Sequence, residues 1–269
     1  MNILLVLPLT FVPFFTPAQK APAAPAAETK SLEFPAAKAK FEGLFEKQDR
    51  AGCSALWKSH PHFVLRVIDA DLEGSLMLRE SSEKPDEKRI AQLHERALWG
   101  ARIAREATGH PMIADYASSF VGWNEQQRRQ FRDGQAVYQR AAGALSVDNV
   151  KDALEAGRET VERALPLGDW WGTAMGYAAM GEASRKGSEF EDALNHFSHA
   201  RMIHRDLGLA GDEYGNLRAM IELCNTLERW QRGLEAITDA QALAQQLGDT
   251  EGGKELAERR KVFESRSAR

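Results

Sequence analysis

A Leu-Gly pair recurs at a fixed interval in the C-terminal half of the chain. The three pairs, Leu167-Gly168, Leu207-Gly208 and Leu247-Gly248, follow one another at intervals of 40 positions. Self-similarity at such a period is typical of proteins that stack one supersecondary unit many times. Glycine readily adopts the left-handed conformation that ends a helix, so each pair predicts a turn between two units. The sequence therefore predicts a solenoid within its 269 residues.

The repeating unit itself is predicted to be a pair of helices. From Pro35 onward apolar residues recur at three and four positions, as in the stripe Val64, Ile68, Leu72 and Leu76, and no convincing alternation of period two is present. This periodicity indicates helices and no strands, so the predicted fold class is all-α. A helical hairpin leaves one apolar face open, and several stacked units are needed to cover it.

Polar residues near the expected turns predict helix caps. Asp169, Asp212 and Asp249 follow the three Leu-Gly pairs and are expected to cap the next helix. Inside one unit, Gly187 is expected to close the first helix, and Ser188 with Glu191 to form a capping box for the second.

Between Ala174 and Leu207 the chain resembles a tetratricopeptide repeat. The residues that match the family pattern of aromatic, Leu-like, Gly, Ala, aromatic and Ala are Tyr177, Met180, Gly181, Ala193, Phe197 and Ala200. Ser184 and Arg205 depart from it, standing where Tyr and Pro are usual. The match weakens one period later and is weaker still one period earlier, where Gly157 replaces a bulky residue. The 40-residue period is similar to that of longer-helix variants of the family.

The resemblance implies a right-handed solenoid of helical hairpins and divides the chain. Residues 137–269 are expected to form the repeats and a C-terminal capping helix. Residues 34–136 are expected to be divergent helices, either continuous with the array or a separate helical domain.

The resemblance also implies a binding face. In this family the first helix of each hairpin lines the concave surface, and the matching positions are Trp171, Met175, Glu182, Arg185, Arg218, Glu222 and Asn225. An aromatic side chain flanked by Glu and Arg suits a peptide-binding anchor. The alternative for Trp171 is packing under the preceding hairpin. Glu182 and Glu222 would repel a C-terminal carboxylate, so a receptor for carboxylate tails is not expected.

Several other patterns were weighed for chemistry. His196, His199 and His204 spread around about 140° of one helix, which disfavours a shared metal ion. The acidic stretch Asp69, Asp71, Glu73, Gly74 and Glu80 fits positions of a calcium loop, but the apolar stripe through it favours an unbroken helix. The sequence contains no serine-nucleophile elbow, zinc-peptidase helix or phosphate loop, and we predict no enzyme activity, metal or cofactor.

The net charge and the two cysteines limit the partners and the metal or disulfide sites that the chain can have. With 35 basic and 39 acidic residues the net charge is −4, which gives no electrostatic footprint for nucleic acid. Cys53 and Cys224 are too far apart in sequence for a CxxC metal pair, which leaves two buried thiols or one long-range disulfide.

The N-terminus indicates export. Residues 1–18 are predicted to be a signal peptide, because Ile3 to Phe15 are almost wholly apolar and Thr16-Pro17-Ala18 resembles a cleavage site. The apolar run is too short to remain as a membrane anchor, and residues 19–33 follow as an Ala/Pro-rich linker. The signal lacks a basic residue before its apolar run. We expect a periplasmic or extracellular protein, or a cytoplasmic one if the start codon is misplaced.

Together these patterns predict an exported scaffold that binds a protein or peptide partner on its concave face. The alternative is a regulatory or helper subunit of an envelope enzyme such as a caspase-like peptidase, because repeats of this kind are often paired with such domains.

Overall fold

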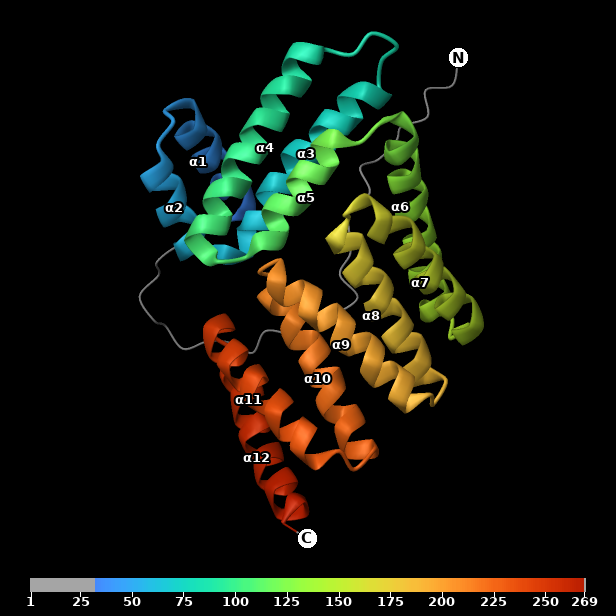
Figure 1. Cartoon of the computed structure of the whole chain (residues 1–269). Helices are drawn as coiled ribbons and strands as arrows, with labels where there is room; N and C mark the ends of the chain where they lie inside the picture. Colours follow the sequence, from blue (N-terminus) through green and yellow to red (C-terminus); the bar gives the residue numbers. More distant parts are fainter. Residues whose placement is uncertain (1–31, 269) are drawn as a thin grey trace. The chain divides into compact units, whose positions relative to one another are not determined.

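A computed structural model describes residues 32–268, and every regular element in this range is helical (Figure 1). The elements are α1 (Phe34–Glu46), α2 (Arg50–Ser59), η1 (Pro61–Phe63), α3 (Val64–Glu80), α4 (Glu87–Thr108), α5 (Pro111–Gly122), α6 (Glu125–Ser146), α7 (Val150–Ala164), η2 (Leu165–Leu167), α8 (Trp170–Lys186), α9 (Phe190–Asp206), α10 (Ala210–Thr226), α11 (Trp230–Leu247) and α12 (Thr250–Ser267). The all-α prediction is confirmed. The predicted signal peptide and nearly all of the linker lie outside the described residues.

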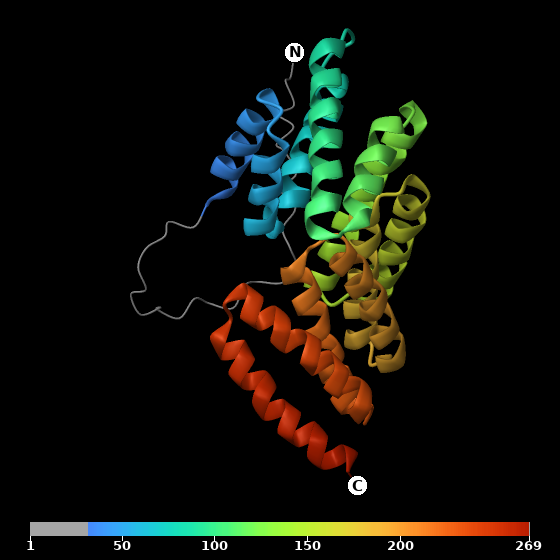
Figure 2. The same cartoon turned by 60° about the vertical axis from the view of Figure 1, so that its left-hand side comes forward.

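From α6 to α12 each helix packs against the next, which confirms the predicted solenoid. The hairpins are α6/α7, α8/α9 and α10/α11, and α12 follows as a single helix. Figure 2 shows α11 and α12 side by side along their length. The first helices of the successive hairpins are thus α6, α8 and α10, with α12 next in the series.

The turns between hairpins are the predicted glycine turns. Gly168, Gly208 and Gly248 have φ of 67°, 71° and 71°, which side chains other than glycine rarely adopt. Asp169 and Asp249 cap the following helices by accepting bonds of 2.9 Å from the backbone N–H groups of Gly172 and Gly252. The same prediction for Asp212 is wrong: it lies inside α10, whose N-cap is Leu209.

The turns within hairpins match the prediction in part. Gly187 is the C-cap of α8, as predicted, with φ of −76°, and the left-handed residue is the next one, Ser188, at 63°. The N-cap of α9 is Glu189, whose side chain makes no capping bond, so the predicted capping box is wrong. The turn is closed by the backbone instead, because Glu189 N–H donates to Ser184 O at 2.8 Å. Asp148 and Glu228 adopt the same left-handed conformation at the other two hairpin tips.

Small residues bring neighbouring helices close together. Gly181 faces the Phe197 ring, where a Cβ atom would lie only 3.0 Å from ring carbons. Gly176 faces the carbonyl of Gly157, where a Cβ would lie 2.9 Å from the oxygen. Gly157 therefore lets α7 and α8 approach closely.

The helices α1 to α5 build their core from large aromatic residues. Trp57, Phe41 and Trp99 are almost completely buried, and the centroids of the Phe41 and Trp57 rings are 5.1 Å apart. A buried ion pair joins α3 to α4, because Arg96 donates two bonds of 2.6 Å to Asp71. A small residue meets a large one in this region too, because a Cβ placed on Gly100 would lie 2.6 Å from a carbon of the Phe41 ring.

One apolar cluster connects this N-terminal region to the repeats. It contains residues of α1 to α5 together with Leu167, Leu207 and Leu209 beside the first two glycine turns. Trp123 Nε1 also donates to Leu167 O at 2.9 Å. The third glycine turn has no such cover, since a Cβ placed on Gly248 would meet nothing within 4 Å.

Two adjacent glycines of α12 should respond oppositely to substitution by alanine. At Gly252 a Cβ would collide with the capping Asp249 carboxylate and the Tyr214 hydroxyl, whereas at Gly253 it would enter open space. We expect Gly253→Ala to stabilise the protein by about 0.4–1 kcal/mol and Gly252→Ala to destabilise it by about 1 kcal/mol through loss of the cap. Urea unfolding of both variants measures this, and equal effects of the two would contradict it.

Candidate partner-binding face

Four of the predicted contact residues form ion pairs on α8 and α10. Glu182 and Arg185 pair within α8, with Arg185 Nε 2.9 Å from Glu182 Oε2. Two carboxylates raise the pKa of Arg185. The larger cause is the hydrogen bond from Arg185 to Glu182, and the charge of Glu222 on α10 contributes less. Arg218 lies one turn before Glu222 on α10, and both side chains are about half exposed.

The helix α12 supplies the partners of the α10 charges. Arg218 Nη2 lies 2.9 Å from Glu255 Oε2, and Glu222 Oε1 lies 2.6 Å from Arg259 Nη1. Arg259 is also 3.2 Å from Glu255, four residues earlier on the same helix. We call this set of paired, solvent-accessible side chains on α8, α10 and α12 the charge ladder. Its members are Glu182, Arg185, Arg218, Glu222, Glu255 and Arg259.

The sequence interpretation missed the two α12 members. The predicted contact residues end at Asn225 on α10, and the matching charges on α12 are offset by 37 positions instead of 40. A usable signal was present, because Glu255 and Arg259 stand four residues apart with the reverse charge order of Arg218 and Glu222.

The other three predicted residues lie differently. Trp171 is half-buried in the first turn of α8 and packs against the apolar cluster shared with the N-terminal helices. Met175 is only 7% exposed, which leaves a partner little of it to touch. Asn225 is exposed near the end of α10.

Exposed ion pairs of this kind hold the helices only weakly. Each contributes about 0–1 kcal/mol in water, because both charges stay hydrated and salt screens them. A partner that offers charges of its own can therefore exchange with the members of the ladder at small net cost. The ladder is electrically balanced, with three Glu and three Arg side chains.

The acidic stretch considered for calcium is helical throughout. It lies within α3, and the calcium loop is excluded by the continuous helix. Its carboxylates have other partners: Asp71 pairs with Arg96, while Glu73 and Glu80 both pair with Arg132 of α6 at 2.7 and 2.8 Å. The favoured interpretation as an unbroken helix is confirmed.

Asp69, on the same helix, belongs to a buried polar cluster where α3, α5 and α8 meet. The Tyr116 hydroxyl of α5 donates to Asp69 Oδ1 at 2.5 Å. Burial, and then the nearby Glu73 carboxylate, raise the pKa of Asp69 to about 8. Burial also raises the pKa of Asp169, the N-cap of α8, to about 7. Both groups favour their protonated forms in the folded protein.

Replacing Asp69 by asparagine should change how stability depends on pH. Because its pKa is raised on folding, the stability it contributes is complete below its ordinary pKa of 3.8 and is lost as pH rises toward 8. We expect the free energy of unfolding to fall less in Asp69→Asn than in the unaltered protein between pH 6 and pH 9. The difference between the two decreases should exceed about 1 kcal/mol. The exposed α5 carboxylate of Asp115 provides the control, Asp115→Asn, and identical pH profiles for all three proteins would contradict the expectation.

The three histidines of α9 do not share a site. His204 is buried, bonded to Asn216 at 2.7 Å, and burial lowers its pKa to about 3. His199 stacks on Tyr177 of α8 with ring centroids 4.9 Å apart. Within residues 32–268 no three His, Cys, Asp or Glu side chains gather closely enough to hold a metal ion.

Both cysteines are buried free thiols, as the first of the two alternatives expected. Burial raises the pKa of Cys53 to about 12 and that of Cys224 to about 11. A protonated, buried thiol is a poor nucleophile.

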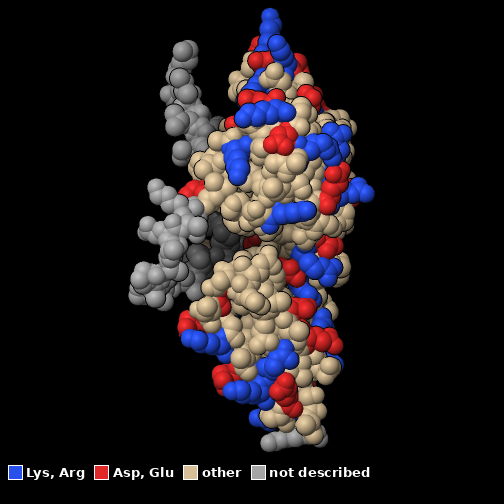
Figure 3. Space-filling model, turned by 90° about the vertical axis from the view of Figure 1, so that its left-hand side faces the viewer, with Lys and Arg blue, Asp and Glu red and all other residues tan. Residues whose placement is uncertain are grey.

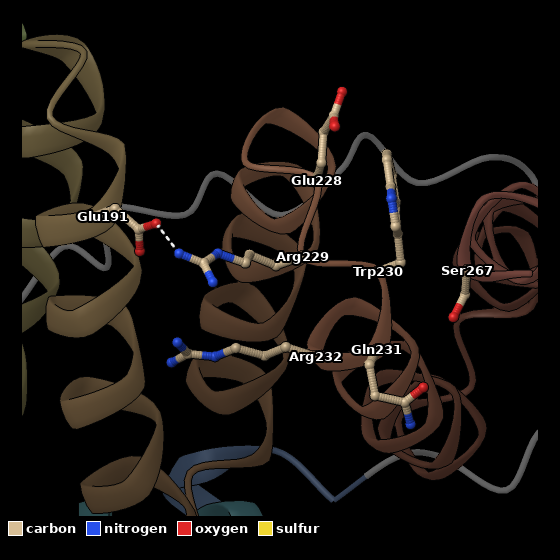
Figure 4. Close-up of a pocket in the computed structure, with 7 residues that line it drawn as sticks. All are labelled: Glu191, Glu228, Arg229, Trp230, Gln231, Arg232 and Ser267. Atoms are coloured by element: carbon tan, nitrogen blue, oxygen red, sulfur yellow. Dashed lines mark hydrogen bonds and ion pairs between the residues drawn. The ribbon is translucent and has the colours of Figure 1, made fainter. Parts of the chain in front are cut away.

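A hollow lies at the tip of the α10/α11 hairpin, lined by Glu191, Glu228, Arg229, Trp230, Gln231, Arg232 and Ser267. Figure 4 shows Arg229 and Arg232 both pointing toward α9, with Trp230 standing between the hairpin tip and the end of α12. Arg229 pairs with Glu191 at 2.7 Å, and Arg232 donates to Ser198 Oγ at 2.7 Å. Its basic groups are thus engaged by the protein, and we assign it no ligand.

Charges of both signs are interspersed over the surface drawn in Figure 3, and uncharged areas separate them. No single-sign field covers this face. Among the helices of residues 32–268, none is sufficiently long and apolar to cross a bilayer.

Comparison with known proteins adds no family. No protein-family model matches the chain, and no curated protein is significantly similar to it. The functional argument therefore depends on the residues of the chain itself.

Proposed function

We propose that this chain is an exported scaffold of tetratricopeptide type, which holds a protein or peptide partner on its first-helix face and catalyses no reaction. The first-helix face means the exposed side chains of α8, α10 and α12. The charge ladder carries the proposal, because three successive helices of a solenoid present exchangeable charges there.

The packing inside the α8/α9 hairpin supports the tetratricopeptide assignment. Gly181 accommodates the ring of Phe197, and Ala193 and Ala200 are completely buried. Small residues opposite a large aromatic one are what the family pattern uses to bring its two helices together. Left-handed turns at the hairpin tips and glycine turns between hairpins add a second regular feature.

Binding would proceed by exchange of ion pairs. A partner carboxylate would compete with Glu182 for Arg185, and a partner cation would compete with Arg259 for Glu222. Each exchange replaces one exposed pair by another that is more shielded from solvent, where the same charges attract more strongly. Binding of this kind weakens as salt concentration rises.

Reversing one charge of the ladder should reduce partner binding. We expect Arg185→Glu to lower the yield of partner crosslinks about tenfold, the equivalent of about 1.4 kcal/mol. The measurement is crosslinking with mass spectrometry on native cell envelopes, which also identifies the partner.

The matched control is Arg129→Glu, because Arg129 forms an exposed ion pair with Glu125 within α6, outside the ladder. Crosslinks that avoid α8, α10 and α12, or that fall equally in both variants, would refute the proposed face.

Export has its own test. We expect the mature protein to begin at Gln19, because the small residues Thr16 and Ala18 stand where signal peptidase cleaves. N-terminal sequencing of the protein recovered from the envelope or the medium measures this. Recovery of full-length protein from the cytoplasm alone would contradict export while leaving the binding face untouched.

A further inference from the structure

The last helix, α12, is attached to the array by few buried residues. Only Gly252, Leu256 and Phe263 of its 18 residues are buried, whereas α8 and α10 bury nine and eight of their 17 residues. The helix also follows the glycine turn at Gly248, where a Cβ atom would meet nothing within 4 Å. Segments with few buried contacts open more readily than the rest of a fold.

The apolar attachment of α12 comes from two side chains. Phe263 lies on Gly233 of α11 and meets Trp230 edge-on, with ring centroids 5.3 Å apart. Leu256 belongs to the same apolar cluster as Phe263 and lies seven residues earlier, on the same side of the helix. These two residues form one apolar stripe.

The polar attachment of α12 comes from the charge ladder and from two further residues. The Tyr214 hydroxyl of α10 donates to the capping Asp249 at 3.0 Å, and Arg260 of α12 donates to Thr238 and Gln241 of α11 at 2.7 and 3.0 Å. Glu255 pairs with Arg218 and Arg259 pairs with Glu222. The later residue of α10 pairs with the later residue of α12, so the two helices run parallel. Each of these α12 charges is paired with a charge of opposite sign on α10. Glu255 and Arg259 thereby occupy the α10 groups that the proposed function assigns to a partner.

We propose that α12 is an internal ligand that a partner helix displaces. The partner segment is an amphipathic helix with Glu and Arg four residues apart and two large apolar residues seven apart, as in Glu255, Arg259, Leu256 and Phe263. It binds parallel to α10 and takes the place of α12, which swings away about Gly248. This inference rests on the proposed function and gives the chemistry of the partner.

The probe for this inference is a labelled synthetic peptide with the sequence of residues 250–268. In the full-length chain the tethered α12 competes at a high effective concentration, so the peptide should bind weakly. The release variant carries Glu255→Arg and Arg259→Glu, which sets like charges against Arg218 and Glu222 and leaves α10 unaltered. We expect the release variant to bind the peptide at least tenfold more tightly than the unaltered chain in fluorescence anisotropy.

Two further variants control for indirect effects. In the first, Glu251→Lys with Lys254→Glu reverses an exposed ion pair within α12 that lies outside the charge ladder, and peptide binding should stay as weak as in the unaltered chain. The second adds Arg218→Glu and Glu222→Arg to the release variant, which restores attraction to α12 and repels the peptide. Its peptide binding should be lost again.

Three outcomes would overturn the inference. The first is a folded release variant that binds the peptide no better than the unaltered chain, and the second is an equal gain in the Glu251/Lys254 variant. The third is a concentration-dependent dimer of the release variant that excludes the peptide, because a second copy would then be the occupant.

Hydrogen exchange on the unaltered protein provides a measurement that needs no variant. We expect amides of α12 to exchange at least tenfold faster than those of α8 and α10, and exchange of α12 only at the rate of global unfolding would overturn the inference. If partner crosslinks fall on the ladder but the peptide does not bind the release variant, this inference fails and the proposed function stands. If no partner contacts the ladder at all, the proposed function fails.

Discussion

The open apolar face of a helical hairpin is the constraint on which the rest of this structure depends. A hairpin whose two helices meet at a small residue, as α8 and α9 do where Gly181 faces Phe197, buries only the surface between them. The remaining apolar surface has to be covered by the next element. Each hairpin from α6 to α11 is therefore stable only in its place between neighbours, and the two ends of the array need different solutions.

At the first end, the aromatic region α1 to α5 provides the cover. Its core shares one apolar cluster with Leu167, Leu207 and Leu209, so the first two glycine turns are held from outside. At the last end, α12 covers α11 with Leu256 and Phe263 and presents a mainly charged outer surface to water. The array is thus held by many buried residues at its first end and by few at its last.

Much of this arrangement follows from local sequence rules, and the exceptions have physical reasons. The glycine turns and the helix periodicity could be predicted because a left-handed residue and an apolar stripe are both local signals. Ser188 could not be predicted as the left-handed residue, because Gly187 beside it is the better candidate on intrinsic preference. Ser188 adopts the left-handed conformation because the backbone closes the turn with a bond from Glu189 N–H to Ser184 O. No side-chain pattern reveals this bond. The buried pair of Arg96 and Asp71 is equally invisible, since it joins residues 25 positions apart.

For the predicted binding face, too, the sequence indicates which residues share one side of a helix but not which residues of other helices they contact. Spacing along one helix was enough to place Glu182 with Arg185 on one side of α8, and Arg218 with Glu222 on one side of α10. It could not indicate that Met175 is covered, because the residues that cover it come from other helices. Nor could it identify α12 as the helix whose charges pair with those of α10. Glu255 and Arg259 stand in the reverse charge order of Arg218 and Glu222, so the helix that ends the array supplies partners for the charges of its neighbour. The residues that complete the fold and the residues that would recognise a partner are consequently the same.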